Sequence, residues 1–275
     1  MSSIKLFRGS FGHVSVLNVA GDFVTHAHRE AHVILWLDGA GGVMTIGNEK
    51  VAPGPRVAAA INSFQPHSHA LSHDGRTGRF LAFYIDPEWA NARRNRPYSE
   101  PLFGRASIPI DKWLHATAAA IFDGMTDDSG AEDIIDYEVE RLIDGLLEAA
   151  DASRTRKSRG LSSHIQYDCR VRKAIELMQA RVCERICFDE VARSVGLSRP
   201  HFFALFKQQT NLTPNVYWNT LRMQEALKQL SWSREPLTSL AWKLGFTNQG
   251  NFTRFFRDHV GVPPTLYREA AHFAA

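Results

Sequence analysis

The sequence predicts a two-domain protein, with an all-β N-terminal part followed by helices and an all-α C-terminal part. Its 275 residues are close to twice the length of a typical domain. The first 85 residues consist of short apolar segments separated by glycine and proline, which is typical of a β-barrel or sandwich. The C-terminal part combines helical periodicity with an internal repeat.

Five strands are predicted in the N-terminal part, from apolar segments bounded by turn residues. They cover residues 13–19, 32–37, 43–46, 57–61 and 79–85. Even spacing of such short strands favours a barrel, which we assign to residues 1–105. Helices are predicted at about 109–125 and 132–150, where apolar residues recur every three or four positions.

The apolar stripe of the second helix packs either on the chain's own barrel or on the same helix of a second subunit. A two-fold interface uses one self-complementary patch, and such a stripe can form it. We therefore expect residues 106–150 to form a homodimer. The candidate dimerisation residues are Ile135, Val139, Leu142 and Leu146. Residues 151–167 are polar and basic, and they are predicted to be a linker.

Charge is divided unevenly along the chain. Residues 1–150 carry 13 Lys and Arg against 19 Asp and Glu, whereas residues 151–275 carry 19 against 10. A basic domain beside an acidic one indicates a polyanionic partner, and nucleic acid is the commonest one in a cytoplasm. No apolar run approaches the ~18 to 20 residues of a membrane span, and the N-terminus lacks a signal-peptide core. We therefore expect a cytoplasmic protein without membrane contact, whose three cysteines are buried thiols rather than disulfides.

The C-terminal part repeats itself at residues 188–217 and 237–267. In each copy a short helix containing a small alanine ends at a glycine, and a capping residue, Ser198 or Asn248, opens a second helix. The matched pairs are Ala192 with Ala241, Gly196 with Gly245, Phe206 with Phe256, Pro214 with Pro264, and Tyr217 with Tyr267. This pattern predicts two helix-turn-helix units. A helix from Asn215 to Leu230, about 24 Å long, is expected to hold them apart.

The second helix of the second unit combines a phenylalanine face with a polar face. Gln249, Asn251, Thr253, Arg254 and Arg257 on that polar face can hydrogen-bond base edges or phosphates in a major groove. Residues 168–268 resemble the DNA-binding domain of the AraC/XylS family of transcriptional regulators, most specifically in the segment LAWKLGFTNQGNFTRFFRDHVGVPPTLYR at 240–268. This resemblance implies a double helix-turn-helix over residues 168–275.

The resemblance also implies DNA contacts at matching positions of both second helices. They fall on Arg199, Pro200, His201, Phe203, Ala204 and Lys207 in the first unit, and on Gln249, Gly250, Asn251, Thr253, Arg254 and Arg257 in the second. The first unit departs from the family at Ala204, where a longer polar residue is common. Pro200 offers no side-chain hydrogen bond either.

Histidines gather in two short segments, THAHREAH and QPHSHA. The first contains His26, His28 and His32, whose equal parity places them on one face of a strand, and the second contains His67 and His69. The N-terminal part resembles a cupin or jelly-roll barrel, in which an HxH motif and a later histidine bind metal. His32 stands where that family usually has Glu. The candidate residues for a divalent transition metal or an organic effector are His26, His28, His32 and His67, and a structural role without a ligand stays open.

These features together predict a sequence-specific transcriptional regulator without catalytic activity. The barrel would sense a small-molecule effector or a metal, and the C-terminal part would bind promoter DNA. The alternative is a cupin metalloenzyme fused to a DNA-binding domain. A third reading, a structural nucleoid protein, would bind DNA without sequence preference.

Overall fold

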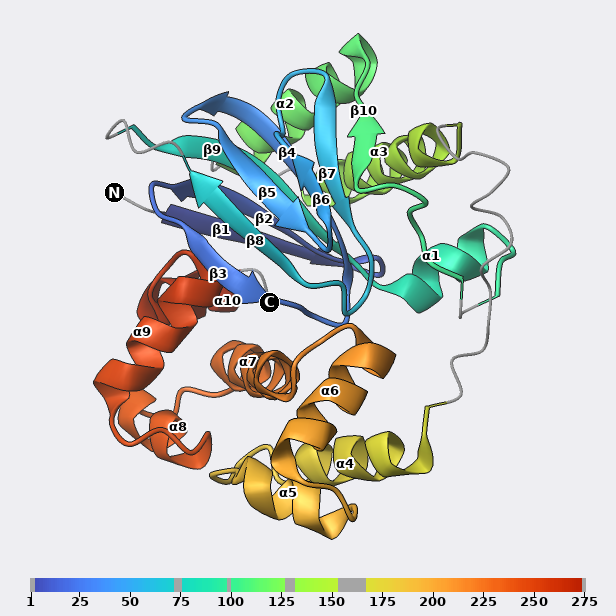
Figure 1. Cartoon of the computed structure of the whole chain (residues 1–275). Helices are drawn as coiled ribbons and strands as arrows, with labels where there is room; N and C mark the ends of the chain where they lie inside the picture. Colours follow the sequence, from blue (N-terminus) through green and yellow to red (C-terminus); the bar gives the residue numbers. More distant parts are fainter. Residues whose placement is uncertain (1–2, 72–75, 98–99, 127–131, 153–166, 274–275) are drawn as a thin grey trace.

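The protein is described here by a computed structural model, and the structure describes residues 3–71, 76–97, 100–126, 132–152 and 167–273. A β-rich N-terminal half (residues 3–152) lies against an all-helical C-terminal half (residues 167–273) (Figure 1). In the described part of the chain, no helix combines the length and the apolar character that a membrane crossing requires.

The N-terminal half contains two antiparallel sheets. The larger sheet has the order β1 (Ser3–Gly9), β2 (Gly12–Val19), β9 (Gly78–Ile85), β4 (Ala31–Gly39), β7 (Val57–Ile61) and β10 (Ser107–Pro109). The smaller sheet has the order β3 (Phe23–His26), β8 (His67–Leu71), β5 (Gly42–Ile46) and β6 (Glu49–Val51). All five predicted strands are present, and the sheet continues past residue 105 because β10 pairs with β7.

Side-chain alternation assigns each face of the larger sheet. Ile34 and Phe80 point toward the smaller sheet and pack with its Met44. Their neighbours Val33 and Leu81 point the other way, into a second apolar cluster formed with the following helices. The β domain therefore has an inner core between the sheets and an outer core beneath the helices.

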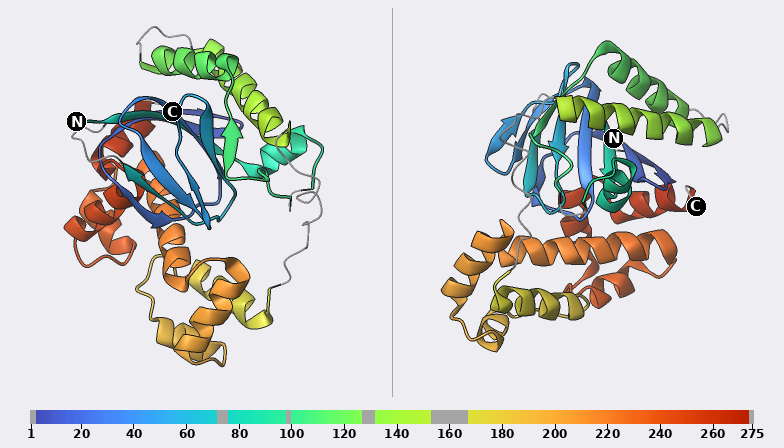
Figure 2. Two further views of the ribbon diagram at one scale, coloured as in Figure 1. Left: turned by 45° about the horizontal axis from the view of Figure 1, so that its top comes forward. Right: turned by 90° about the vertical axis from the view of Figure 1, so that its right-hand side faces the viewer.

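The N-terminal half also contains α1 (Pro87–Arg93), which lies between β9 and β10 in the chain, and α2 (Lys112–Thr126) and α3 (Glu132–Ala152), which follow β10. Helices α2 and α3 pack side by side over the outer face of the sheet (Figure 2). Gly145 of α3 allows this close approach, because a Cβ there would lie 2.8 Å from the ring of Trp113.

The apolar stripe of α3 belongs to the chain's own core, which corrects the expectation of an intersubunit seam. Val139, Leu142 and Leu146 are each 0% exposed and pack against α2 and the sheet. The side chain of Ile135 lies outside the described residues, and so do 153–166 of the expected linker. A homodimer stays a prediction, and it would have to use another surface.

The C-terminal half consists of helices: α4 (Cys169–Ala180), α5 (Phe188–Ser194), α6 (Arg199–Thr210), α7 (Pro214–Trp232), α8 (Leu237–Lys243), α9 (Gln249–Val260) and α10 (Pro264–Phe273). Among these, α5 and α6 form the first copy of the repeat and α8 and α9 the second. The matched glycines Gly196 and Gly245 both adopt positive φ, +72° and +73°, and so turn the chain between α5 and α6 and between α8 and α9. The cysteines depart from expectation: Cys169, Cys183 and Cys187 are all exposed.

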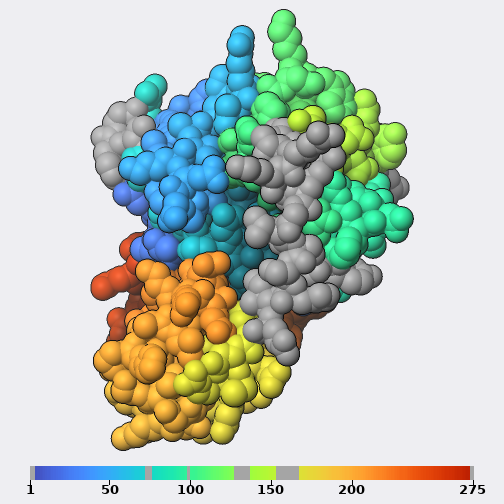
Figure 3. Space-filling model, turned by 45° about the vertical axis from the view of Figure 1, so that its right-hand side comes forward, coloured from blue at the N-terminus to red at the C-terminus, as the bar shows by residue number. Residues whose placement is uncertain are grey.

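Contacts between the two halves are extensive. Ile4 and Leu6 of β1 extend the apolar core formed by α7, α9 and α10. Arg8 of β1 donates a hydrogen bond to the Ser231 hydroxyl of α7, and the ring of Phe64 stacks on Tyr217 at 6.3 Å. In the space-filling view of Figure 3, the orange and yellow C-terminal half lies directly against the blue N-terminal half on the face shown.

Candidate DNA interface and histidine cluster

Helix α9 divides its residues between a buried and an exposed face. Phe252 and Phe256 are 0% exposed, whereas Arg254 and Arg257 lie on the opposite, solvent-facing side. The Asn248 side chain accepts a hydrogen bond from the Asn251 backbone N–H at 2.8 Å, as predicted for a capping residue. Among the described residues, no carboxylate forms an ion pair with either arginine, so both guanidinium groups face solvent without a competing acid.

The other predicted contact residues of α9 lie on or beside this face. Gln249, Gly250 and Asn251 are exposed, and Thr253 is half-buried. Gln249 accepts a hydrogen bond from Thr238 at 2.7 Å, and the Asn251 amide donates to Thr247 at 2.7 Å. These side chains are oriented by α8 and by the turn before α9.

Helix α6 presents a less polar surface. Its exposed predicted contacts are Arg199, Pro200, His201, Ala204 and Lys207. Arg199 already pairs with Asp189 at 2.9 Å. Phe203 is half-buried and packs edge-on against Phe188 at 5.6 Å, so its ring contributes to packing as well as to the surface.

Helix α7 separates the two units. Its 19 residues extend about 28 Å at 1.5 Å per residue. Arg222 of α7 lies 3.6 Å above the Phe246 ring and donates to the Leu244 carbonyl oxygen at 2.9 Å. This contact fixes α8 and the start of α9 on the connecting helix, and burial lowers the Arg222 pKa to about 10.

Three of the four predicted metal or effector ligands converge at one end of the β sheets. The candidate ligand atoms of His26, His28 and His67 all lie within 4.8 Å of one another. His26 ends β3 and His67 begins β8, and these two residues are directly paired in the sheet. His28 follows in the turn before β4, so backbone pairing brings distant sequence positions together.

A backbone carbonyl orients each of these imidazoles. Nδ1 of His26 contacts the Val24 oxygen at 2.7 Å, and the corresponding distances are 2.9 Å from His28 to Glu30 and 2.9 Å from His67 to Gln65. A carbonyl oxygen only accepts, so Nδ1 carries the proton and Nε2 keeps its lone pair. Histidines that bind metals use this same arrangement, in which the second nitrogen donates to a fixed acceptor.

Electrostatics keep the cluster neutral. The pKa of His28 is lowered to about 3, mainly by burial and then by the neighbouring His26. Burial and the neighbouring His28 lower the pKa of His67 to about 3 as well. Neutral imidazoles are the form that binds metal, and Nε2 of His28 is buried without a hydrogen-bond partner. The residues present therefore fit a divalent transition metal.

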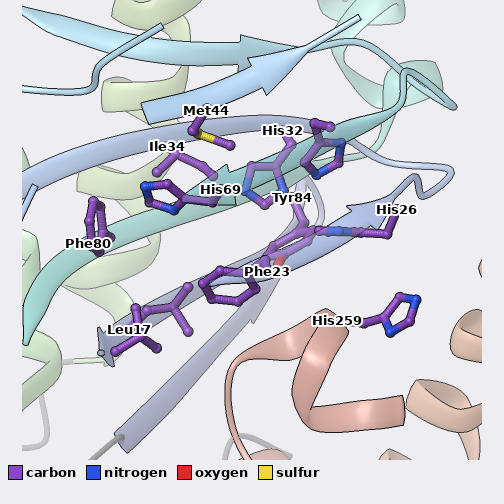
Figure 4. Close-up of a pocket in the computed structure, with 12 residues that line it drawn as sticks. Leu17, Phe23, His26, His32, Ile34, Met44, His69, Phe80, Tyr84 and His259 are labelled. Atoms are coloured by element: carbon purple, nitrogen blue, oxygen red, sulfur yellow. The ribbon is translucent and has the colours of Figure 1, made fainter. Parts of the chain in front are cut away.

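His32 and His69 lie deeper between the sheets than His26, and they border one cavity with His26 and His67 (Figure 4). His32 is 3% exposed, and neither of its ring nitrogens has a partner within the described chain. The cavity that these residues border, with Ile34 and Phe80, is only about 30 Å³. A space of that size holds a water molecule or an ion and excludes an organic effector.

Sequence reasoning missed one residue that borders the same cavity. His259 of α9 lies with its ring centroid 5.8 Å from that of His26. It belongs to the DNA-binding repeat, where the matched position of the first copy is Gln209, so its approach to the β sheets had no local sequence signal.

The comparisons with known proteins support a helix-turn-helix domain in the C-terminal half. Residues 191–270 match a family model described as a helix-turn-helix domain. The uncharacterised HTH-type transcriptional regulator YobQ of Bacillus subtilis is 28% identical over 191 residues, which cover 69% of this chain and 76% of YobQ. The HTH-type transcriptional activator RhaS of Klebsiella pneumoniae is 32% identical over 114 residues. That match covers 42% of this chain and 41% of RhaS, so the chain spans about two fifths of that relative.

A likeness in fold extends over nearly the whole chain. An apo form of ToxT from Vibrio cholerae superposes with a TM-score of 0.57 at 12% identity, covering 96% of this chain and 99% of ToxT. ToxT with a bound unsaturated fatty acid gives a TM-score of 0.51 at 11% identity, covering 100% and 96%. The chain therefore contains a helix-turn-helix domain similar to those of HTH-type transcriptional regulators, and its fold, a β-rich N-terminal half followed by this helical half, is like that of ToxT. Its relatives are transcriptional regulators rather than enzymes.

Proposed function

We propose that this regulator reads a specific DNA sequence with α6 and α9, and that a ligand held by its N-terminal domain controls this binding. The observation that carries the proposal is the convergence of three neutral imidazoles in a chain that also bears two exposed recognition helices. We assign the two sheets to a cupin-like barrel, on the basis of the paired ends of β3 and β8 and the HxH motif.

The DNA-binding part of the proposal rests on spacing and charge. Successive major-groove segments on one face of DNA lie about 34 Å apart, and α7 is a spacer of the same order. The exposed arginines and polar residues of α9 suit base edges, whereas α6 offers mainly Arg199, His201 and Lys207. We therefore assign most base reading to α9 and mostly phosphate contacts to α6.

The sensing part of the proposal favours a metal at the three histidines. His26, His28 and His67 each present Nε2, and imidazole suits Zn²⁺, Cu²⁺, Ni²⁺ or Fe²⁺. His32, the fourth predicted ligand, lies outside the group of three. When bound, such an ion would cross-link β3, the following turn and β8.

An organic effector has a larger space available beside the same histidines. A cleft of about 420 Å³ lies between the halves, bordered by Arg8, Tyr84, Lys228 and Trp232 and also by His26, His28 and His259. Pockets for small molecules are typically ~300 to 1,000 Å³, so this cleft is large enough. ToxT, which shares the fold, has been solved with a fatty acid, and a small-molecule effector in this cleft is compatible with metal binding at the histidines.

Elemental analysis of the full chain, purified without a polyhistidine tag, tests the metal assignment. We expect about one equivalent of a transition metal, and a chelator should lower the melting temperature because the ion binds only the folded domain. His28→Ala should abolish both effects, whereas His115→Ala, a histidine of α2 outside the cluster, should leave them intact. Less than about a tenth of an equivalent, with melting unchanged by the chelator, would exclude the metal.

A further inference from the structure

His259 places an imidazole of the DNA-binding half beside the histidine cluster of the N-terminal half. Its Nδ1 contacts the Phe255 carbonyl oxygen at 2.6 Å, so Nδ1 donates and Nε2 keeps its lone pair. His259 is 9% exposed, and its Nε2 is buried without a partner in the described chain. A buried polar atom without a partner is costly, and the lone pair of this nitrogen is available to a ligand.

The position of the ring suits coordination to the same ion as His26. Two imidazoles bound through Nε2 to one tetrahedral ion at about 2.1 Å have ring centroids about 5 to 6 Å apart. The centroids are 5.8 Å apart for His26 and His259, 6.0 Å for His26 and His28, and 5.0 Å for His28 and His67. The ring of His259 is thus within this range of His26, as the ring of His32 is of His28 at 4.9 Å and of His67 at 5.8 Å.

The surrounding packing holds α9 against the β sheets at this point. Gly261, which ends α9 with φ of +82°, lies so close to β3 that a Cβ there would be 2.6 Å from the Phe23 ring. The Phe255 ring lies 4.3 Å from that of His259, at an interplanar angle of 44°, and limits its rotation. The end of α9 is therefore positioned by the N-terminal half.

We infer that His259 is the fourth metal ligand, so that the ion ties the second recognition helix to the N-terminal domain. This inference rests on the proposed metal site at His26, His28 and His67. An ion bound by both halves stabilises the arrangement in which they meet, and it changes the freedom of the helix that carries Arg254 and Arg257. The metal then acts as the signal that sets DNA affinity.

Co²⁺ titration of the full-length chain, without a tag, tests the assignment. The absorption of bound Co²⁺ reports its ligands, so His259→Ala should alter the visible spectrum and weaken binding about tenfold or more. His259→Phe keeps an aromatic ring against Phe255 without a ligand atom, and it should give the same loss in a folded protein. His115→Ala is the matched control, because its Nε2 is also buried without a partner but lies on α2.

DNA affinity measured with and without Zn²⁺ supplies the second readout. We expect the ion to change the affinity of the unaltered chain about fivefold or more, and both His259 variants to remove this dependence. If both His259 variants keep the Co²⁺ spectrum and the Zn²⁺ dependence of DNA affinity unchanged, the inference is overturned, while the three-histidine site remains intact. If His32→Ala instead removes the fourth ligand, the site lies wholly within the N-terminal domain and the inference is wrong. Absence of any metal binding by the unaltered chain would overturn the proposed metal site as well.

Discussion

Single side chains of α9 separate the buried core from the face that we propose to read DNA. Phe252 and Phe256 are completely buried, whereas Arg254 and Arg257 face solvent one turn apart. Substitution of either arginine therefore leaves the core unchanged, and its effect reports on DNA binding alone. The same division was predicted from the helical spacing of the phenylalanines.

Arg254→Ala should cost about 1 to 3 kcal/mol on the preferred DNA site and relax the preference at one base step. Arg257→Ala, nearer the end of the helix, should weaken binding to all sequences about equally. Competition between preferred and random DNA measures both. If the Arg254→Ala variant retains the original ratio of affinities for preferred and random DNA, Arg254 contacts phosphate rather than a base.

Two glycines that end short elements of the repeat differ in their surroundings. Gly196 and Gly261 both have positive φ, but a Cβ at Gly196 meets open space, whereas one at Gly261 meets Phe23. Gly196→Ala should cost about 1 kcal/mol from backbone strain alone. Gly261→Ala should lower the melting temperature further, because it also pushes α9 away from β3. Equal losses would show that this interdomain contact contributes nothing.

At the scale of elements, α3 acts as a cover for the sheet. Leu142→Asp would place an unpaired charge in the outer core, so we expect the N-terminal half to lose its fold rather than yield a folded monomer. Tyr137→Asp, at a position 66% exposed on the same helix, should have little effect. Circular dichroism and sedimentation check this pair. A folded monomer from Leu142→Asp would instead support the prediction that the α3 stripe forms an intersubunit interface.

The elements differ in how well the sequence predicted them. Strands β2, β4, β5, β7 and β9 were predicted because they are apolar and lie between clear turn signals. β8 was not, because its sequence HSHAL has only two apolar residues and forms no apolar run, although His67 within it was identified as a candidate ligand. The repeat predicted the paired helices α5 and α6, and α8 and α9, because each copy carries its own cap, glycine and core positions.

Periodicity could not decide which partner an apolar stripe packs against. The α3 stripe was consistent with two partners, and only the three-dimensional packing assigned it to the sheet. The contact of His259 with the cluster is of the same kind. It joins His259 to His26, more than 200 positions earlier in the chain, through the packing of two domains, for which a single sequence has no pattern.

At the scale of the whole molecule, the buried histidines make stability depend on pH. In the folded chain the pKa values of His28 and His67 are lowered to about 3, whereas unfolded histidine titrates near 6.5. Between these values the unfolded chain binds more protons than the folded chain. The metal-free protein should therefore lose stability as the pH falls from about 6.5 toward 3, by up to about 1.4 kcal/mol per pH unit for each such histidine.

Denaturant unfolding in chelator at a series of pH values measures this loss. His28→Ala removes one of the titrating groups, so its stability should depend less steeply on pH below 6.5. His115→Ala serves as the control on α2. A flat profile for the unaltered chain between pH 6.5 and 4 would show that the histidines are protonated in the folded state.

We propose that α6 and α9 act as two recognition helices on one connecting helix, α7, and selection from random-sequence DNA tests this most directly. We expect the full chain to enrich a motif of two short blocks whose centres lie about one helical turn, 10 to 10.5 base pairs, apart. The block read by α9 should show the stronger base preferences, and Arg254→Ala should weaken the preference at one of its positions. Recovery of DNA without any enriched sequence, at an affinity set by salt alone, would contradict the account.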